Sequence, residues 1–233
     1  MLDAALALAA LTLTAVAPST PPSLGPTVRQ VVVHEGARLL FTHVRVLDGT
    51  GRAAVEDRNV AVEGGRIAAI GPGADASAAA GQVVIDGRGK TLLPGLVGLH
   101  DHMYYIARPD LDATGHSDPP LVVPQMTYSS PRLYLAAGVT TVRTTGSVEG
   151  YADLNLRGLI DAWQVPGPHL DVTAPYLQGK SDLFMQMYQL RDAADARRFV
   201  AFWADAGATS FKAYMHITRA ELGAAIELSL IHI

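Results

Sequence analysis

The 233-residue sequence contains no cysteine. A disulfide, a thiolate metal ligand and a cysteine nucleophile are therefore excluded. The sequence also has no cluster of lysine or arginine, and its formal net charge is -4. This charge pattern lacks the basic surface with which proteins bind nucleic acid or anionic membranes. Any metal ion must therefore be held by histidine, carboxylate or modified lysine.

Two common catalytic motifs are also missing. No G-x-S-x-G nucleophile elbow occurs. Gly89-Lys90-Thr91 resembles the end of a phosphate-binding loop, but the first glycine of that motif would fall on Val84 and no helix is expected to follow. Serine-nucleophile and phosphate-loop chemistry are therefore not expected.

The amino terminus begins with an apolar run that ends in Ala15-Val16-Ala17. The run is too short to span a bilayer comfortably and is typical of an export signal, although Asp3 stands where a basic residue is usual. We expect a periplasmic or secreted protein; the alternative is a buried helix of a cytoplasmic one. Several prolines follow, so residues 1–29 are interpreted as a signal peptide and an irregular, proline-rich tether.

Two patterns divide the rest of the chain. Residues 30–90 have short alternating apolar runs separated by turns such as Gly64-Gly65, which predicts a small β module. In residues 91–227, strands alternate with helical patterns, as in a parallel sheet with crossover helices. The predicted fold is therefore α/β, with four βα units that make the first half of a (β/α)8 TIM-type barrel. The strands predicted for these units are Leu92–Leu99, Gly138–Thr144, His169–Pro175 and Thr209–Tyr214.

The carboxyl terminus carries two signals. Thr218 and Glu221 have the spacing of a capping box, which predicts a helix from about Arg219. Residues 228–233 match the translation of a transposon end that is used as a sequencing adapter; the alternative is that they simply end this helix. Because a half barrel exposes two strand edges, we interpret 228–233 as an adapter-derived tail and the chain as an amino-terminal fragment.

The residues that predict chemistry lie at the ends of barrel strands. His100 and His102 close the first strand, and residues two apart on a strand point to the same side. Two adjacent imidazoles form a metal clamp, and barrel enzymes place their active sites at this end of the strands. Lys212 lies near the end of the fourth strand, where burial disfavours its charge. As a carbamate it would be an anionic metal ligand; the alternative is an ordinary lysine at the barrel rim.

An ordered series of motifs resembles the metal-dependent amidohydrolase superfamily, and in particular its imidazolonepropionase-like and prolidase-like branch. The similarity covers residues 38–227. The motifs that carry it are FTHVRVLDGTG, NVAVEGGRIAAIGPG, VVIDGRGKTLLPGLVGLHDHM, AAGVTTVRTTG and GATSFKAYMHITRAEL.

This resemblance implies a β-sandwich domain, of which residues 30–90 are the amino-terminal part, beside a metal-dependent barrel. It implies that His100 and His102 bind the more buried metal and that Lys212 is a carbamylated bridge. Two further histidines on strands five and six and a catalytic aspartate on strand eight would lie beyond the chain. Thr144 stands where members of the family often have aspartate, which puts local hydrogen bonding and substrate preference in doubt.

Substrate-binding candidates come from the loops at the active-site end of the strands. The candidates are Tyr104, Tyr105, Gln178, Lys180, Asp182 and His216.

The predicted function of the complete protein is hydrolysis of amide, dipeptide or cyclic-amide C–N bonds by water that one or two divalent ions, expected to be zinc, activate. A mononuclear cyclic-amide hydrolase or deaminase is one alternative, and a non-catalytic barrel that serves as a scaffold or binding module is another. We expect a small-molecule or dipeptide substrate, no nucleic-acid partner and no stable membrane span, and leave a homo-oligomer open. The fragment alone is expected to be inactive.

Overall fold

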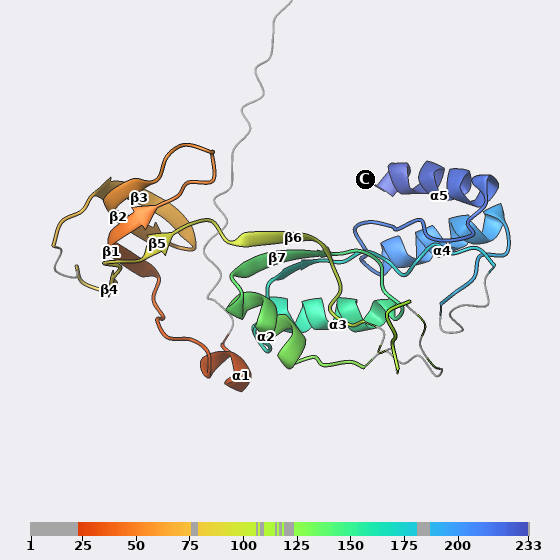
Figure 1. The fold of residues 1–233 in the computed structure, drawn as a ribbon, viewed down its shortest axis with the longest axis horizontal. Helices are drawn as coiled ribbons and strands as arrows, with labels where there is room; N and C mark the ends of the chain where they lie inside the picture. The colour runs from red at the N-terminus through yellow and green to blue at the C-terminus, as the bar shows by residue number, and fades with distance from the viewer. Residues whose placement is uncertain are drawn as a thin grey trace, which may run out of the picture.

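Strand pairing divides the chain into two sheets (Figure 1). The computed structural model describes residues 23–75, 79–105, 107, 110–114, 116, 118, 124–180 and 187–232. The first sheet has five strands in the order β3-β2-β1-β4, with β5 paired to β1. These strands are β1 (Arg38–Val46), β2 (Val55–Glu63), β3 (Arg66–Pro72), β4 (Gln82–Asp86) and β5 (Thr91–Leu92).

Alternation of apolar side chains explains this first sheet. β1 runs antiparallel to β2 and parallel to β4. Val44 of β1 and Val60 of β2 are the most buried residues of this sheet. Gly64 and Gly65 make the turn from β2 to β3 with φ of 54° and 76°, a conformation that glycine adopts without strain. The predicted β module is therefore present as a single sheet in the described residues, and the second layer of a sandwich stays a prediction.

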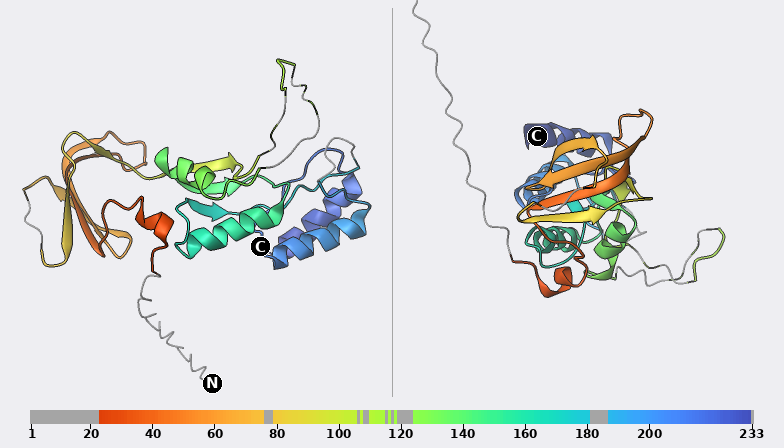
Figure 2. Two further views of the ribbon diagram at one scale, coloured as in Figure 1. Left: turned by 90° about the horizontal axis from the view of Figure 1, so that it is seen from below. Right: turned by 90° about the vertical axis from the view of Figure 1, so that its left-hand side faces the viewer.

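The second sheet is parallel and has the order β6-β7-β8. Helices alternate with its strands, and α2 packs on β7 while α3 packs on β8 (Figure 2). The alternation of strands and helices confirms the mixed α/β class, while the half barrel stays a prediction. The elements are β6 (Leu96–Asp101), α2 (Ser129–Ala136), β7 (Val139–Thr144), α3 (Gly150–Asp161), β8 (His169–Asp171), α4 (Ala193–Asp205) and α5 (Arg219–His232).

The fourth predicted strand is present only as an interrupted pairing. Thr173 pairs with Ser210 and Leu177 with Ala213 as isolated parallel bridges. The chain from residue 209 onward therefore lies beside residues 173–177, the extension of β8, as expected. The two segments do not form a continuous ladder of backbone hydrogen bonds. This pairing still brings the end of the fourth βα unit to the same edge as the ends of β6 and β7.

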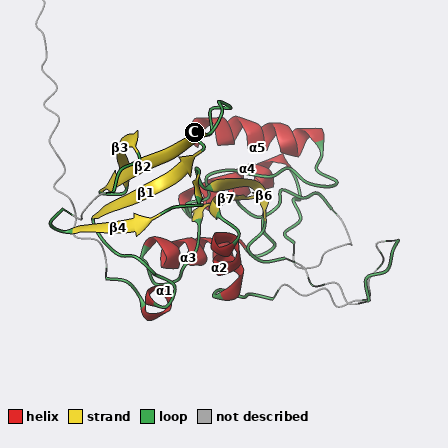
Figure 3. Cartoon of the chain, turned by 60° about the vertical axis from the view of Figure 1, so that its left-hand side comes forward, coloured by secondary structure: helices red, strands yellow, loops and turns green. Residues whose placement is uncertain are grey.

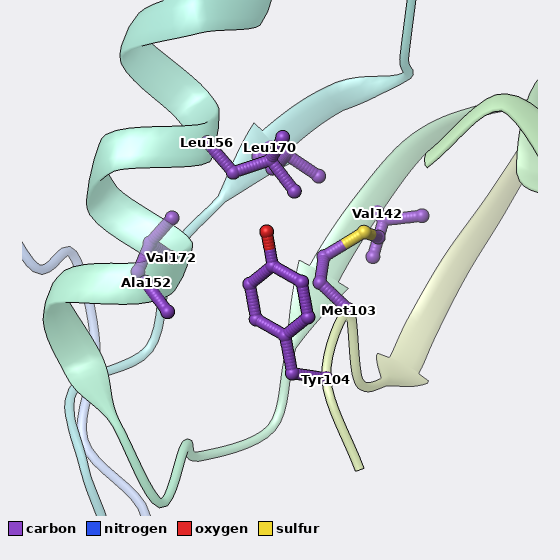
Figure 4. Packing of buried hydrophobic residues seen from close by; sticks show 7 residues of the cluster. All are labelled: Met103, Tyr104, Val142, Ala152, Leu156, Leu170 and Val172. Carbon is purple, nitrogen blue, oxygen red and sulfur yellow. The ribbon is translucent and has the colours of Figure 1, made fainter. Parts of the chain in front are cut away.

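The main core lies between α3 and the parallel sheet (Figure 4). Leu156 on α3 is 1% exposed and packs with Val142 of β7 and with Leu170 and Val172 in and after β8. Leu156 and Ala152 are four residues apart, so both face the sheet from one side of the helix. This packing fixes α3 against the strands. A second cluster joins the residues after β8 to α4 and α5.

The amino-terminal segment corrects one prediction. Residues up to 29 were expected to form an irregular tether, but α1 (Pro26–Arg29) is helical and Val28 is 5% exposed. The Gly25 amide donates to the Trp163 carbonyl at 2.7 Å, and the Thr27 hydroxyl donates to the Gln164 carbonyl at 2.6 Å. The tether prediction was therefore wrong at its carboxyl end, because contacts far away in sequence order it. The predicted signal peptide lies outside the described residues.

Helix α5 begins where the sequence predicts. The Thr218 amide donates to Glu221 Oε2 at 2.8 Å and the Glu221 amide donates to Thr218 Oγ1 at 3.3 Å, which confirms the capping box. The helix continues through residues 228–232 (Figure 3), and the adapter origin of residues 228–233 stays a prediction. Within the part of the chain that the structure describes, every helix is too short or too polar to span a bilayer.

The packing of α3 predicts a contrast between two leucines. Leu156→Ala should lower the free energy of unfolding by about 2–5 kcal/mol, because it leaves a cavity beside the sheet. Leu159→Ala, three residues further along the same helix and 39% exposed, is the matched control and should change it by less than about 1 kcal/mol. Urea denaturation measures both values. Equal losses for the two variants would contradict this account of the core.

Asp153 predicts a pH dependence of stability. The residue is 2% exposed, and burial raises the pKa of its carboxyl from 3.8 to about 7, against a smaller opposing effect of the Ser147 hydroxyl. The folded protein therefore retains a proton that the unfolded chain releases, so stability is lost as the pH rises from 3.8 through about 7. Asparagine has no such proton, so Asp153→Asn should gain stability relative to the wild type between pH 5 and pH 8.

The control for this experiment is Asp161→Asn, an exposed position at the other end of α3. Urea denaturation of the three proteins at both pH values gives the comparison. A difference between wild type and Asp153→Asn that does not change with pH would rule out a buried, protonated Asp153.

Candidate active site

His100 and His102 lie at the carboxyl end of β6. Their ring centroids are 6.0 Å apart, with an interplanar angle of 74°. His100 is exposed and His102 is partly buried. Asp101 lies between them in sequence, and the Tyr134 hydroxyl of α2 donates to the His102 carbonyl at 3.3 Å. The end of the strand is thereby held to the helix, and the two imidazoles lie next to each other.

A backbone carbonyl fixes the proton on His102. His102 Nδ1 lies 3.1 Å from the Gly146 carbonyl oxygen. Because a carbonyl oxygen only accepts, Nδ1 must carry the proton, and Nε2 of the neutral ring keeps its lone pair. Gly146 has φ of 87°, and a Cβ at this position would lie 2.8 Å from the Tyr176 ring. Glycine is therefore required where the carbonyl turns toward His102.

The surroundings also favour the neutral form of His102. Burial lowers its pKa, and the positive charges of Lys212 and His100 lower it further, against the opposing hydrogen bond to Gly146. A neutral imidazole with a free Nε2 is the form in which histidine binds a metal ion.

Lys212 faces the same side as His102. Its Nζ lies 5.2 Å from the centre of the Tyr176 ring and 5.5 Å from that of Tyr214. The Tyr176 ring is also 6.5 Å from the His102 ring, so it lies against both groups. Burial lowers the pKa of Lys212, and within the described chain no carboxylate forms an ion pair with it. The amine therefore has an increased neutral fraction, and neutral amines react with carbon dioxide.

These residues fit part of a metal site. Among the described residues, no three His, Asp or Glu side chains gather as metal ligands. His100 and His102 supply two nitrogen donors, and Lys212 supplies a third only after modification, because an ammonium group has no free lone pair. The assignment of these three residues as ligands stays a prediction.

The two adjacent tyrosines that were candidates for substrate binding occupy different environments. Tyr104 is 7% exposed in the main core, and its hydroxyl donates to Thr127 Oγ1 at 3.4 Å (Figure 4). This placement favours a packing role. Tyr105 is 53% exposed, and its ring lies 4.8 Å from that of His102. Only Tyr105 is therefore positioned at the histidine pair.

Gln178 is a buried amide without a partner. It is 1% exposed, and among the described residues neither its Oε1 nor its Nε2 has a hydrogen bond. Leu177 packs toward α4 and α5, whereas the preceding Tyr176 has its ring below the Lys212 amine. An unpaired buried amide is unfavourable, and the role of Gln178 in substrate binding stays a prediction.

The other candidates lie in nearby loops. Lys180 and His216 are exposed. Gly179 packs so closely on the His216 carbonyl that no Cβ would fit, which brings the loops after the third and fourth strands together. Asp182 lies outside the described residues.

Thr144 has a structural role in the described site. It is fully buried, its Oγ1 accepts from the Thr173 amide at 3.0 Å and its carbonyl accepts from the Thr173 hydroxyl. These bonds join β7 to the extension of β8. The effect of threonine rather than aspartate at this position on substrate preference stays a prediction.

Sequence reasoning missed two residues of this site. Tyr176 contacts both His102 and Lys212, and Gly146 orients His102. The only sequence signal was position: both follow predicted strands, at the end where the candidate ligands lie.

The sequence comparisons give no match. No known family profile matches the chain, and no curated protein sequence matches it.

Comparison with solved structures identifies the fold. A candidate prolidase from Bifidobacterium longum superposes with a TM-score of 0.64 at 22% identity, over 84% of this chain and 47% of the other. A Xaa-Pro dipeptidase with bound methionine gives 0.68 at 18% identity, over 84% and 54%, and phenylurea hydrolase B gives 0.58 at 18% identity, over 84% and 53%. The chain thus spans about half the length of these structures, and it shares its fold with prolidase and amidohydrolase proteins.

Proposed function

We propose that this chain is part of a metal-dependent hydrolase that cleaves C–N bonds in amides, dipeptides or cyclic amides. The observation that carries the proposal is the hydrogen bond from His102 Nδ1 to the Gly146 carbonyl, which leaves Nε2 free beside His100. The similar structures include a Xaa-Pro dipeptidase and phenylurea hydrolase B, whose names denote dipeptide and urea substrates. The histidine pair supports a metal site, and the names of the similar structures support hydrolysis of a C–N bond.

The residues of the chain have separate tasks in this proposal. His100 and His102 would hold a divalent cation, which we take to be zinc, and Lys212, as a carbamate, would supply a further anionic ligand. Such a cation, when bound, lowers the pKa of water and polarises the substrate carbonyl. Tyr105 and Gln178 contact substrate, and the Gln178 amide pairs with the polar groups of the C–N bond that is cleaved. His216, Lys180 and Asp182 remain substrate contacts of the second rank.

One alternative is distinguished by Lys212. A mononuclear hydrolase or deaminase needs the two imidazoles but no carbamate. The lowered pKa of Lys212 favours the carbamate, because a neutral amine attacks carbon dioxide. We further propose that residues 1–17 direct export and that residues 30–90 and 91–227 are separate domains of the enzyme.

Metal binding gives the first test. His100→Ala and His102→Ala should each lower zinc affinity at least tenfold, because neutral imidazoles are the principal ligands. His169→Ala, an exposed histidine at the amino end of β8, is the matched control and should bind zinc as the wild type does. Isothermal titration with zinc measures the affinities. Unchanged zinc binding in both site variants would refute the metal site.

Carbon dioxide gives the second test. Purification in buffers free of carbon dioxide should lower the metal content of the wild type, and added bicarbonate should restore it, because the carbamate forms from the neutral Lys212 amine. Lys212→Arg keeps a positive charge but cannot form the ligand, so its metal content should not respond to bicarbonate. Lys180→Arg is the control for an exposed lysine. A wild type that is equally loaded with and without bicarbonate would support the mononuclear alternative.

A further inference from the structure

Tyr176 is a buried tyrosine at the active-site end of the parallel sheet, and no task in the proposed function falls to it. It is 7% exposed and packs with Met187, Val148 and Tyr214. Protein interiors are closely packed, so a ring of this size limits where the side chains around it can lie. Its contacts with the candidate ligands therefore bear on how the site is arranged.

The backbone on either side of Tyr176 is fixed to two different segments. Pro175 pairs with Ser147, in the turn after β7. The Leu177 amide donates to the Lys212 carbonyl at 2.9 Å. Tyr176 therefore lies between the turn after β7 and the segment that carries the candidate lysine ligand, and both neighbours hold its backbone there.

The Tyr176 ring packs against the turn that orients His102. A Cβ at Gly146 would lie 2.8 Å from the ring, so the ring and the Gly146 backbone are in close contact. The Gly146 carbonyl accepts from His102 Nδ1. The rings of His102 and Tyr176 have centroids 6.5 Å apart. One part of the ring therefore contacts the histidine side of the site.

The same ring lies below the Lys212 amine. Nζ is 5.2 Å from the centre of the Tyr176 ring and 5.5 Å from that of Tyr214, and the two rings are 4.6 Å apart. A cation within about 6 Å of a ring centre is attracted to the ring face. No described residue forms a hydrogen bond or an ion pair with the amine. The two ring faces are therefore the contacts that hold it.

We propose that Tyr176 is a positioning residue, whose ring holds the Lys212 amine on the same side of the site as His102. A free lysine side chain occupies many rotamers, and ordering it costs entropy. The ring removes part of this cost in the metal-free protein, so a ligand formed at the amine would already be in place. The consequence for metal affinity rests on the proposed function, whereas the position of the amine does not.

The ring has a second effect with the opposite sign. Its face stabilises the ammonium form of Lys212, and an ammonium group cannot bind a metal ion. If this effect were dominant, removal of the Tyr176 ring would strengthen metal binding. If positioning is dominant, removal of the ring weakens metal binding. The sign of the change in zinc affinity therefore distinguishes the two effects.

The position of the amine can be measured directly, because the sequence has only three lysines. Lys90 and Lys180 are exposed, so they are internal references for Lys212 in the full chain labelled with carbon-13 lysine. In NMR spectra of the metal-free protein, ring currents should shift the Lys212 ε-methylene protons upfield of the other two. This shift should fall to about half in Tyr176→Leu, since the Tyr214 ring remains at a similar distance. Tyr176→Phe keeps the ring and should keep the shift.

Isothermal titration with zinc, in the presence of bicarbonate, measures the consequence for the site. Tyr176→Leu should bind zinc about tenfold more weakly, the usual effect of losing a residue that orients a ligand. Tyr176→Phe, the conservative rescue, should bind zinc as the wild type does. If Tyr176→Leu does not fold, Tyr176→Met carries the test, because methionine adapts to irregular space in a core.

Two controls separate positioning from other effects. Tyr151→Leu removes an exposed tyrosine of α3 and should change neither the Lys212 signal nor zinc affinity. Leu156→Ala destabilises α3 from its core side, so it should lower stability and leave the Lys212 signal in place.

The possible results have opposite meanings. A Lys212 signal that does not move in Tyr176→Leu, or a zinc affinity that rises in this variant, would overturn the inference. A signal that moves as far in Leu156→Ala would do the same. A wild type that binds no zinc but shows the expected Lys212 shifts would overturn the proposed function and support the positioning role.

Discussion

Parallel pairing of β6 with β7 is the constraint on which the candidate site depends. Asp101 pairs with Thr144, and the Thr145 amide donates to the Asp101 carbonyl. This register brings the end of β6, which carries the histidines, beside the turn that follows β7. The Gly146 carbonyl can reach His102 only because the strands end at the same level. The histidines belong to the end of β6 and the Gly146 carbonyl to the turn after β7. The register between the two strands makes them neighbours.

The same sheet leaves an apolar edge. Leu96, Val97 and Leu99 of β6 are each more than half exposed, whereas the face toward α2 and α3 is covered (Figures 1 and 3). Apolar surface of this kind is normally covered in a stable protein. This exposed strand also carries His100, the more exposed of the two histidines.

The sequence predicted elements better than it predicted contacts. The strand predicted at Leu92–Leu99 is displaced from β6 (Leu96–Asp101), because Leu92 pairs with β1 in the first sheet. Alternation of apolar residues located β7, because this pattern reflects which face a strand buries. The spacing of His100 and His102 predicted that their rings would be neighbours, for the same reason. The role of Tyr176 could not be predicted, because the chain after β8 pairs through isolated bridges and its side-chain directions depend on that irregular pairing. Helix α1 was missed because its partners lie more than a hundred residues away.

The charge of Lys212 links lysine chemistry to metal binding. As an ammonium, Lys212 lies over the rings of Tyr176 and Tyr214, which stabilise a cation through their π faces. Burial opposes this charge, and its field disfavours a second cation at His102. A carbamate at the same place reverses the sign of that field. On the proposed function, modification of Lys212 would therefore strengthen cation binding by the histidines, and by thermodynamic reciprocity a bound cation would stabilise the carbamate.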